Sequence, residues 1–209
     1  MNWSELERHF SAARLGRYYR FFGQDADKAA EAYAHNLLLA EAMIPMLNVL
    51  EIALRNGINT RLSKHYGRID WWEAWLGAAE FNWQNKEIAN TKAKLARKKD
   101  VLSADKIVAE LTFGFWTSLF NTTFQAILWK DLRLVFPCCP KSIRQRHTIS
   151  SALNQARDLR NRVFHHEPLL WLAPALIEQY TASEEIISWL DPQLSAWGWL
   201  NTTECAWCG

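Results

Sequence analysis

Apolar side chains recur every three or four residues along residues 28–64, which is the period of one helix face rather than of a strand. The apolar positions of its second half are Leu47, Leu50, Leu54, Ile58 and Leu62. Asp27 is placed to cap the start of this helix, and Gly67 is placed to end it. Because Pro45 lacks the amide hydrogen that a helix interior uses, we expect the helix to be interrupted or kinked there.

The rest of the chain repeats the helical period. Further helices are expected over residues 3–22, 84–99, 103–120, 124–136, 141–166 and 174–190. No segment shows the alternation of a strand. A chain of 209 residues is long enough to bury a real core within one domain. We therefore predict an all-α fold, with a single domain over residues 1–196 and a loosely ordered tail over residues 197–209.

Tryptophan is the one residue type that departs from an ordinary globular composition, with twelve in the chain. Trp71, Trp72 and Trp75 are clustered, and Trp83 follows. Such side chains either anchor a core or stack on nucleobases, and we favour the core interpretation. The net charge of +2 is too small to indicate a nucleic-acid partner by itself.

The start of the chain alternates acids, bases and apolar residues and does not resemble a signal peptide. We therefore expect a cytoplasmic protein with free thiols at Cys138, Cys139, Cys205 and Cys208. The spacing of Cys205 and Cys208 suits a zinc ligand pair, which Cys138, Cys139 or His147 would have to complete. Because adjacent cysteines rarely chelate one ion well, we expect no metal site and no cofactor.

Residues 111–129 carry no charge and are nearly long enough to span a bilayer. The segment also contains Asn121, Gln125 and several hydroxyl side chains. We interpret it as a buried core helix and expect no contact with a membrane.

The end of the helix expected over residues 141–166 concentrates groups that bind or protonate a phosphate. Arg160, Asn161 and His165 lie within about one and a half turns. A polar stripe comprises Asn154, Asp158, Asn161 and His165, with Arg157 at its border. Arg160 instead falls among apolar positions, so it either extends its head to water or faces a surface lined with anions. Pro168 stops the helix soon after His165, where a cation suits the negative end of the helix dipole.

Three stretches carry a family resemblance. Arg160-Asn161-x-x-x-His165 resembles the R-N-x-x-x-H form of the Arg-x4-6-His motif of HEPN ribonucleases, and LRNRVFHHEPL (residues 159–169) resembles the signature of the Abi-like family of abortive-infection proteins. NVLEIALRNGINTRL (residues 48–62) and VAELTFGFWTSLF (residues 108–120, followed by Trp129) resemble the same family. These stretches in this order are more specific than the short motif alone.

The resemblance implies a HEPN-like multi-helix bundle with additional helices. It also implies a metal-independent endoribonuclease that acts in abortive infection, in antiphage defence or as a toxin. HEPN ribonucleases place two such helices face to face, so we expect a homodimer with a composite site and RNA as the substrate. A neutralising antitoxin or a sensor protein is a further expected partner.

The residue types suit this chemistry. A base takes the proton of a ribose 2′-hydroxyl, which attacks the adjacent phosphorus, and an acid protonates the leaving 5′-oxygen. His165 suits both proton transfers, because histidine titrates near neutral pH. Arg160 suits the phosphoryl oxygens through its planar fork, and Asn161 suits orientation of the phosphate or of the histidine. His166 and Glu167 either tune His165 or are simply exposed at the helix end, and Arg157 is a further candidate for a supporting role.

A second Arg-Asn pair occurs at Arg55-Asn56, four residues after Glu51. Glu51 and Arg55 either form an ion pair on the helix surface, or Arg55 or Asn56 lies beside His165 as a second phosphate contact. We favour the ion pair and keep all three residues as supporting candidates.

Basic residues gather on the helix expected over residues 84–99 and just after it. They include Lys92, Lys94, Arg97, Lys98 and Lys99, with few acids between them. Such a helix is commonly only a solvated face, but this one is also the best candidate for binding an RNA backbone.

The alternative to an endoribonuclease is a non-catalytic helical module that binds RNA or protein as a sensor. Position discriminates between the two. The enzyme is favoured if Arg160 and His165 of two chains meet in one basic cleft, and the binding module if these residues are separately buried in ion pairs.

Overall fold

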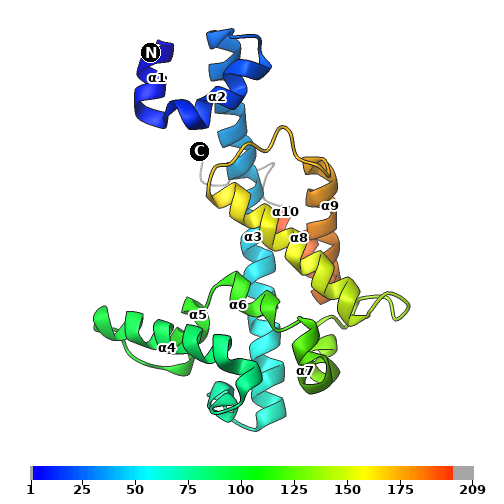
Figure 1. The fold of residues 1–209 in the computed structure, drawn as a ribbon. Helices are drawn as coiled ribbons and strands as arrows, with labels where there is room; N and C mark the ends of the chain where they lie inside the picture. Colours follow the sequence, from blue (N-terminus) through cyan, green and yellow to red (C-terminus); the bar gives the residue numbers. More distant parts are fainter. Residues whose placement is uncertain (1, 200–209) are drawn as a thin grey trace, which may run out of the picture.

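A single long helix forms the axis of the molecule (Figure 1). The structure is a computed structural model, and it describes residues 2–199. Helix α3 (Ala26–Tyr66) has 41 residues, which corresponds to roughly 60 Å of helix. Every regular element in the described part of the chain is helical, so the all-α prediction is confirmed.

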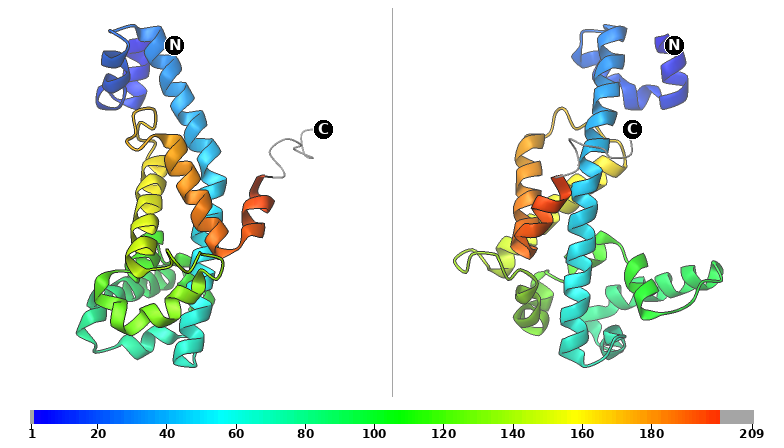
Figure 2. Two further views of the ribbon diagram at one scale, coloured as in Figure 1. Left: turned by 90° about the vertical axis from the view of Figure 1, so that its right-hand side faces the viewer. Right: turned by 180° about the vertical axis from the view of Figure 1, so that it is seen from behind.

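The other elements pack along α3 in three groups. In chain order they are α1 (Trp3–Phe10), α2 (Ala12–Phe21), η1 (Trp71–Trp75), η2 (Ala79–Phe81), α4 (Asn82–Arg97), α5 (Ala104–Glu110), α6 (Phe113–Ser118), η3 (Thr122–Phe124), α7 (Gln125–Leu132), η4 (Arg133–Val135), α8 (Arg146–Phe164), α9 (Leu176–Leu190) and α10 (Pro192–Trp199). Helices α1 and α2 lie at the start of α3, α8 and α9 lie beside its middle, and α4 to α7 surround its end (Figures 1 and 2).

Helix α3 begins and ends through side-chain and backbone features that the sequence signals. The Asp25 carboxylate, rather than that of Asp27, caps it by accepting the Lys28 N–H at 3.1 Å. Gly67 ends it in the left-handed region, at φ 67°, as predicted. Pro45 lies inside the helix, which continues on both sides of it, so the expected interruption is wrong.

The core divides into two clusters. The larger one buries the predicted apolar face of α3 against α8, α9 and the tryptophans of η1. Trp71, Trp72 and Trp75 are buried in it, which confirms the core interpretation, whereas Trp83 is exposed. The smaller cluster joins α2 to the start of α3 and comprises Leu15, Tyr18, Ala29, Ala32 and Tyr33.

Two expected helices are each broken into two. The helix over residues 3–22 breaks at Ser11, which adopts φ 70° and caps α2 with its hydroxyl. The helix over residues 103–120 is capped by Ser103 as predicted, but it breaks at Leu111, whose backbone is extended. The Thr112 hydroxyl then caps α6 by accepting the Phe115 N–H at 3.3 Å. The uncharged stretch over residues 111–129 is therefore not one helix.

The start of α8 and the expected tail also differ from the prediction. Helix α8 begins at Arg146 rather than near residue 141, because residues 141–143 form a turn. Residues 197–199 of the expected tail belong to α10, and residues 200–209 lie outside the described residues.

Candidate active site

The end of α8 is a tight capping turn that carries the predicted motif. The Glu167 N–H donates to the Arg162 carbonyl at 2.9 Å, and the His166 N–H donates to the Val163 carbonyl at 3.1 Å. This pair of bonds is the Schellman arrangement, whose turning residue lies in the left-handed region. That residue is His166, at φ 52°. Glycine is the usual occupant, so the backbone here carries a side chain at some energetic cost.

A buried asparagine of α3 fixes the segment that follows this turn. Asn36 has no exposed surface. Its Nδ2 donates to the Glu167 carbonyl at 3.1 Å, and its Oδ1 accepts the Leu169 N–H at 2.6 Å. Sequence reasoning missed this residue. The available signal was a polar residue in phase with the buried positions Ala29, Ala32 and Tyr33.

Arg160 is anchored to α3 through one edge of its guanidinium. Its Nε lies 3.3 Å from Glu51 Oε2, without the geometry of a hydrogen bond, and its Cζ lies 4.3 Å from the centre of the Phe164 ring. The side chains of Arg160 and Glu51 are 29% and 20% exposed. No described residue accepts a hydrogen bond from the Nη groups of Arg160, so they remain able to bind an anion.

Asn161 and His165 lie on the exposed side of α8, as the polar stripe predicted. The side chain of neither residue makes a hydrogen bond or an ion pair within the described residues. Arg157, at the border of the stripe, pairs with Asp158 at 3.2 Å. The motif therefore combines an anchored arginine with two polar side chains that have no structural partner in this part of the chain.

The second Arg-Asn pair lies elsewhere. Glu51 pairs with Arg160 rather than with Arg55, so the favoured ion pair within α3 is not formed. Arg55 instead donates to the Ala109 carbonyl and to Asn56 Oδ1, each at 3.4 Å. Arg55 and Asn56 make no hydrogen bond to His165 among the described residues, and neither lines the hollow that His165 lines.

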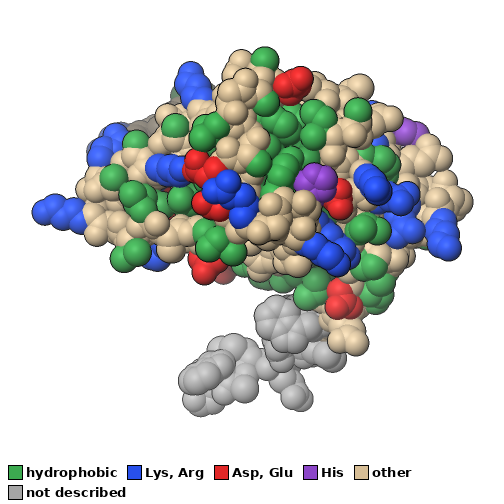
Figure 3. Space-filling model, turned by 90° about the horizontal axis from the view of Figure 1, so that it is seen from below, with side chains coloured by type: hydrophobic (Ala, Val, Ile, Leu, Met, Phe, Trp, Pro, Cys, Tyr) green, Lys and Arg blue, Asp and Glu red, His purple; other side chains and the backbone are tan. Residues whose placement is uncertain are grey.

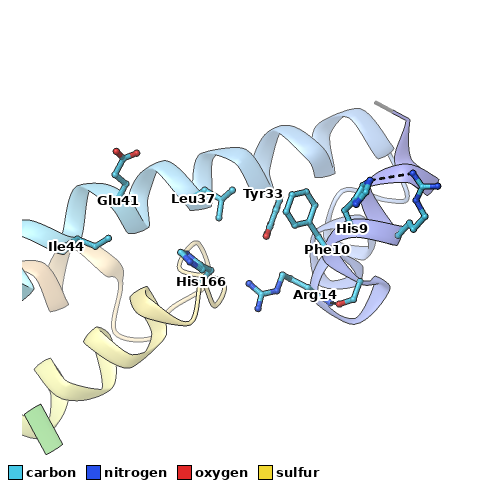
Figure 4. A pocket seen from close by; sticks show the side chains of 10 residues that line it. His9, Phe10, Arg14, Tyr33, Leu37, Glu41, Ile44 and His166 are labelled. Carbon is cyan, nitrogen blue, oxygen red and sulfur yellow. Dashed lines mark hydrogen bonds between the residues drawn. The ribbon is translucent and has the colours of Figure 1, made fainter. Parts of the chain in front are cut away.

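A groove opens between the capping turn at the end of α8, α3 and the hairpin of α1 and α2 (Figure 4). It encloses about 780 Å³. Arg14 and His166 line it, and the Arg14 Nη1 donates to the His165 carbonyl at 3.4 Å. Sequence reasoning missed this contact, because 151 residues separate its two partners.

The basic helix α4 lies toward the opposite end of α3 from the hairpin of α1 and α2 (Figure 2). Lys92 pairs with Glu73 at 2.7 Å, and Lys94 and Lys98 pair with Glu110 at 2.6 and 3.1 Å. The two lysines lower the pKa of the Glu110 carboxyl through their hydrogen bonds. Arg97 and Lys99 are exposed. On this end of the molecule, basic side chains are interspersed with acidic ones (Figure 3).

The cysteines are divided between two regions. Cys138 is exposed and Cys139 is buried, and burial raises the pKa of the Cys139 thiol. Cys205 and Cys208 lie outside the described residues.

Comparisons of the chain with protein-family models, with curated proteins and with solved structures gave no match. Among the described helices, α3 is long and apolar enough to cross a membrane by length and composition. The core helix of a soluble protein passes the same test. Buried residues of α3 belong to both core clusters, and 33% of its most apolar window is buried.

Proposed function

We propose that this chain is a metal-independent endoribonuclease of the HEPN type, acting in the cytoplasm in abortive infection, in antiphage defence or as a toxin. One observation carries the proposal. The Nη groups of Arg160 make no hydrogen bond among the described residues, and Asn161 and His165, one and five residues later, are exposed and unpaired in the same part of the chain. Three side chains that suit phosphate binding thus lie near the end of α8, and two of them, Asn161 and His165, have no structural role among the described residues.

In the proposed reaction, His165 takes the proton of the ribose 2′-hydroxyl. The hydroxyl oxygen attacks the adjacent phosphorus, the bond to the 5′-oxygen breaks, and a 2′,3′-cyclic phosphate forms. Arg160 stabilises charge on the phosphoryl oxygens, and Asn161 orients the phosphate. Because one imidazole does not act as base and acid in the same step, His165 of a second copy protonates the leaving oxygen.

A face of α3 beside the motif supports such a homodimer. Leu38, Pro45 and Ile52 are exposed at successive positions seven residues apart. Ile52 directly follows Glu51, the partner of Arg160, and projects about 100° farther round α3. An exposed apolar stripe on a helix suits a contact between two copies related by a two-fold axis. In that arrangement the two motifs lie near the shared interface.

The test measures RNA cleavage and melting temperature together. His165→Ala and Arg160→Ala are each expected to lower the cleavage rate about 10²–10³-fold, the typical effect of removing one contact to developing charge. His147→Ala changes an exposed histidine in the first turn of the same helix and serves as the matched control. Cleavage is expected to persist in excess EDTA and to leave 2′,3′-cyclic ends. Full activity of His165→Ala, or an absolute need for a divalent metal, would overturn the proposal.

The second candidate is a non-catalytic RNA- or protein-binding sensor module. The ion pair between Arg160 and Glu51 favours it, because that pair gives Arg160 a structural role between α8 and α3. For this candidate, Arg160→Ala lowers the melting temperature, and the wild-type protein binds RNA without cleaving it.

A further inference from the structure

The groove beside the capping turn is lined mainly by cationic and aromatic side chains. Its walls comprise Arg8, His9, Phe10, Arg14, Tyr33 and His166, together with Ser11, Leu37, Glu41 and Ile44. A smaller hollow of about 420 Å³ adjoins it and shares Ser11, Arg14 and His166. That hollow adds Arg17 and His165, so the lining reaches the proposed catalytic histidine.

The side chains that line this groove carry more positive than negative charge. In Figure 4 the Arg14 guanidinium points toward His166, whereas the Glu41 carboxylate points away from both. Among the described residues that line either hollow, the other acid is Glu167, which pairs with Arg162 at 3.2 Å. Arg8 contacts only the His9 ring, at 3.5 Å, among the described residues. The guanidinium groups thus retain donors that no protein acceptor uses.

The floor of the groove leads along α3 to Arg160. Tyr33, Leu37, Glu41 and Ile44 line the groove, and Glu51 continues the same arc of the helix at about 100° per residue. Ile44 and Glu51 are about 10 Å apart along the axis. The groove and the motif therefore occupy one side of α3.

With Ser11, Gln24 and Lys99, His166 is one of four non-glycine residues with positive φ in the described part of the chain, and its imidazole lines the groove. A residue with a Cβ occupies a left-handed position that glycine fills without strain. Its imidazole is exposed in the groove and makes no hydrogen bond or ion pair within the described residues. A strained, exposed and unpartnered histidine is characteristic of functional sites.

We propose that this groove binds the phosphodiester backbone of the RNA strand next to the cleavage site. Arginine forks match phosphate oxygens, and Phe10, which is 39% exposed, offers a ring face for a base. The inference rests on the proposed function and assigns the strand to the hairpin of α1 and α2 rather than to α4. Arg14 and His166 bind backbone phosphate, and Arg8 binds the phosphate farther along the strand.

The experiment measures binding of a fluorescein-labelled 2′-O-methyl oligouridylate, which lacks the attacking hydroxyl, by anisotropy over a range of salt concentrations. Arg14→Gln and Arg8→Gln are each expected to lower the slope of log K against log salt by about 0.7, the value for one phosphate contact on a single strand. Arg20→Gln removes the same charge from α2, where the Arg20 side chain donates to the Gly16 carbonyl and to no other acceptor among the described residues, and it leaves the slope unchanged. His166→Gly weakens binding without lowering the melting temperature.

The outcomes separate this inference from the proposed function. Absence of binding by the wild-type protein, or equal slopes for Arg8→Gln, Arg14→Gln and Arg20→Gln, overturns the groove. Because Arg14 also contacts the His165 carbonyl, Arg8→Gln decides the matter if Arg14→Gln loses its fold. A groove that binds, in a protein that never cleaves unmodified RNA, leaves the groove standing and refutes the nuclease. Cleavage that depends on His165 but not on Arg8 or Arg14 supports the nuclease and refutes RNA binding in the groove.

Discussion

Replacing His166 with glycine is expected to stabilise the protein while impairing its function. An L-residue in the left-handed region costs roughly 1–2 kcal/mol, and His166 has φ 52°. Glycine removes this cost. Because glycine also gives the unfolded chain more conformational freedom, it lowers the free energy of unfolding by about 0.4–1 kcal/mol. Since the imidazole makes no hydrogen bond among the described residues, nothing else is lost. The net gain is about 0.5–1 kcal/mol, or roughly 1–4 °C in melting temperature for a chain of this size.

Thermal unfolding followed by circular dichroism measures this difference, with His166→Ala as the comparator. Alanine removes the imidazole but keeps the Cβ, so its melting temperature is expected to stay near that of the wild type. A rise for glycine alone assigns the effect to backbone strain. A lower melting temperature for His166→Gly would refute the reasoning, because the imidazole would then contribute more to the fold than the strain costs.

Two further predictions concern buried polar atoms. Tyr18→Phe is expected to raise the free energy of unfolding by about 1 kcal/mol at neutral pH, because the Tyr18 hydroxyl is buried without a protein partner. Burial raises the pKa of Tyr18 to about 12, so wild-type stability falls as the pH rises from about 10 through 12; a parallel loss in Tyr18→Phe would contradict this assignment. Glu51→Gln is expected to cost about 1–2 kcal/mol, between the values for exposed and buried pairs, since Glu51 and Arg160 are mostly buried. Urea denaturation of Glu51→Gln, of Arg160→Gln and of the double variant measures the coupling energy between the two side chains. A coupling energy of zero would show that the pair contributes nothing to stability.

Helical periodicity predicted the elements whose apolar faces are longest. The buried positions of α3 and of α8 follow the predicted stripes, since burial of one face imposes that period. The breaks were not predicted. Ser11 and Leu111 are neither glycine nor proline. The next helix is capped at one break by the hydroxyl of Ser11 itself and at the other by that of Thr112, and such hydroxyls compete for the backbone. Such local hydrogen bonds leave no periodic signal in a sequence.

The candidate site was predictable only where it is local. Asn161 lies in the last turn of α8 and His165 caps its end, so their exposure follows from helix geometry and from the stop before Pro168. The partner of Arg160 and the groove depend on which helices pack against the end of α8. Arg14 meets the His165 carbonyl across 151 residues, and no spacing along the chain encodes that contact. The left-handed backbone of His166 was not predicted, because the helical period was expected to continue through residue 166.

The continuity of α3 through Pro45 holds the two parts of the candidate site in register. A proline inside a helix costs about 3 kcal/mol and leaves the carbonyl of the residue four positions earlier, Glu41, without its helical donor. Burial of Met43, Met46 and Leu47 around it offsets this cost, at about 1.5–3 kcal/mol for each fully buried side chain. The groove lies before Pro45, at residues 33–44, and the partner of Arg160 lies after it, at Glu51. A bend at Pro45 would therefore move the groove relative to Arg160, so the packing that keeps α3 continuous also sets the geometry available to the proposed RNA strand.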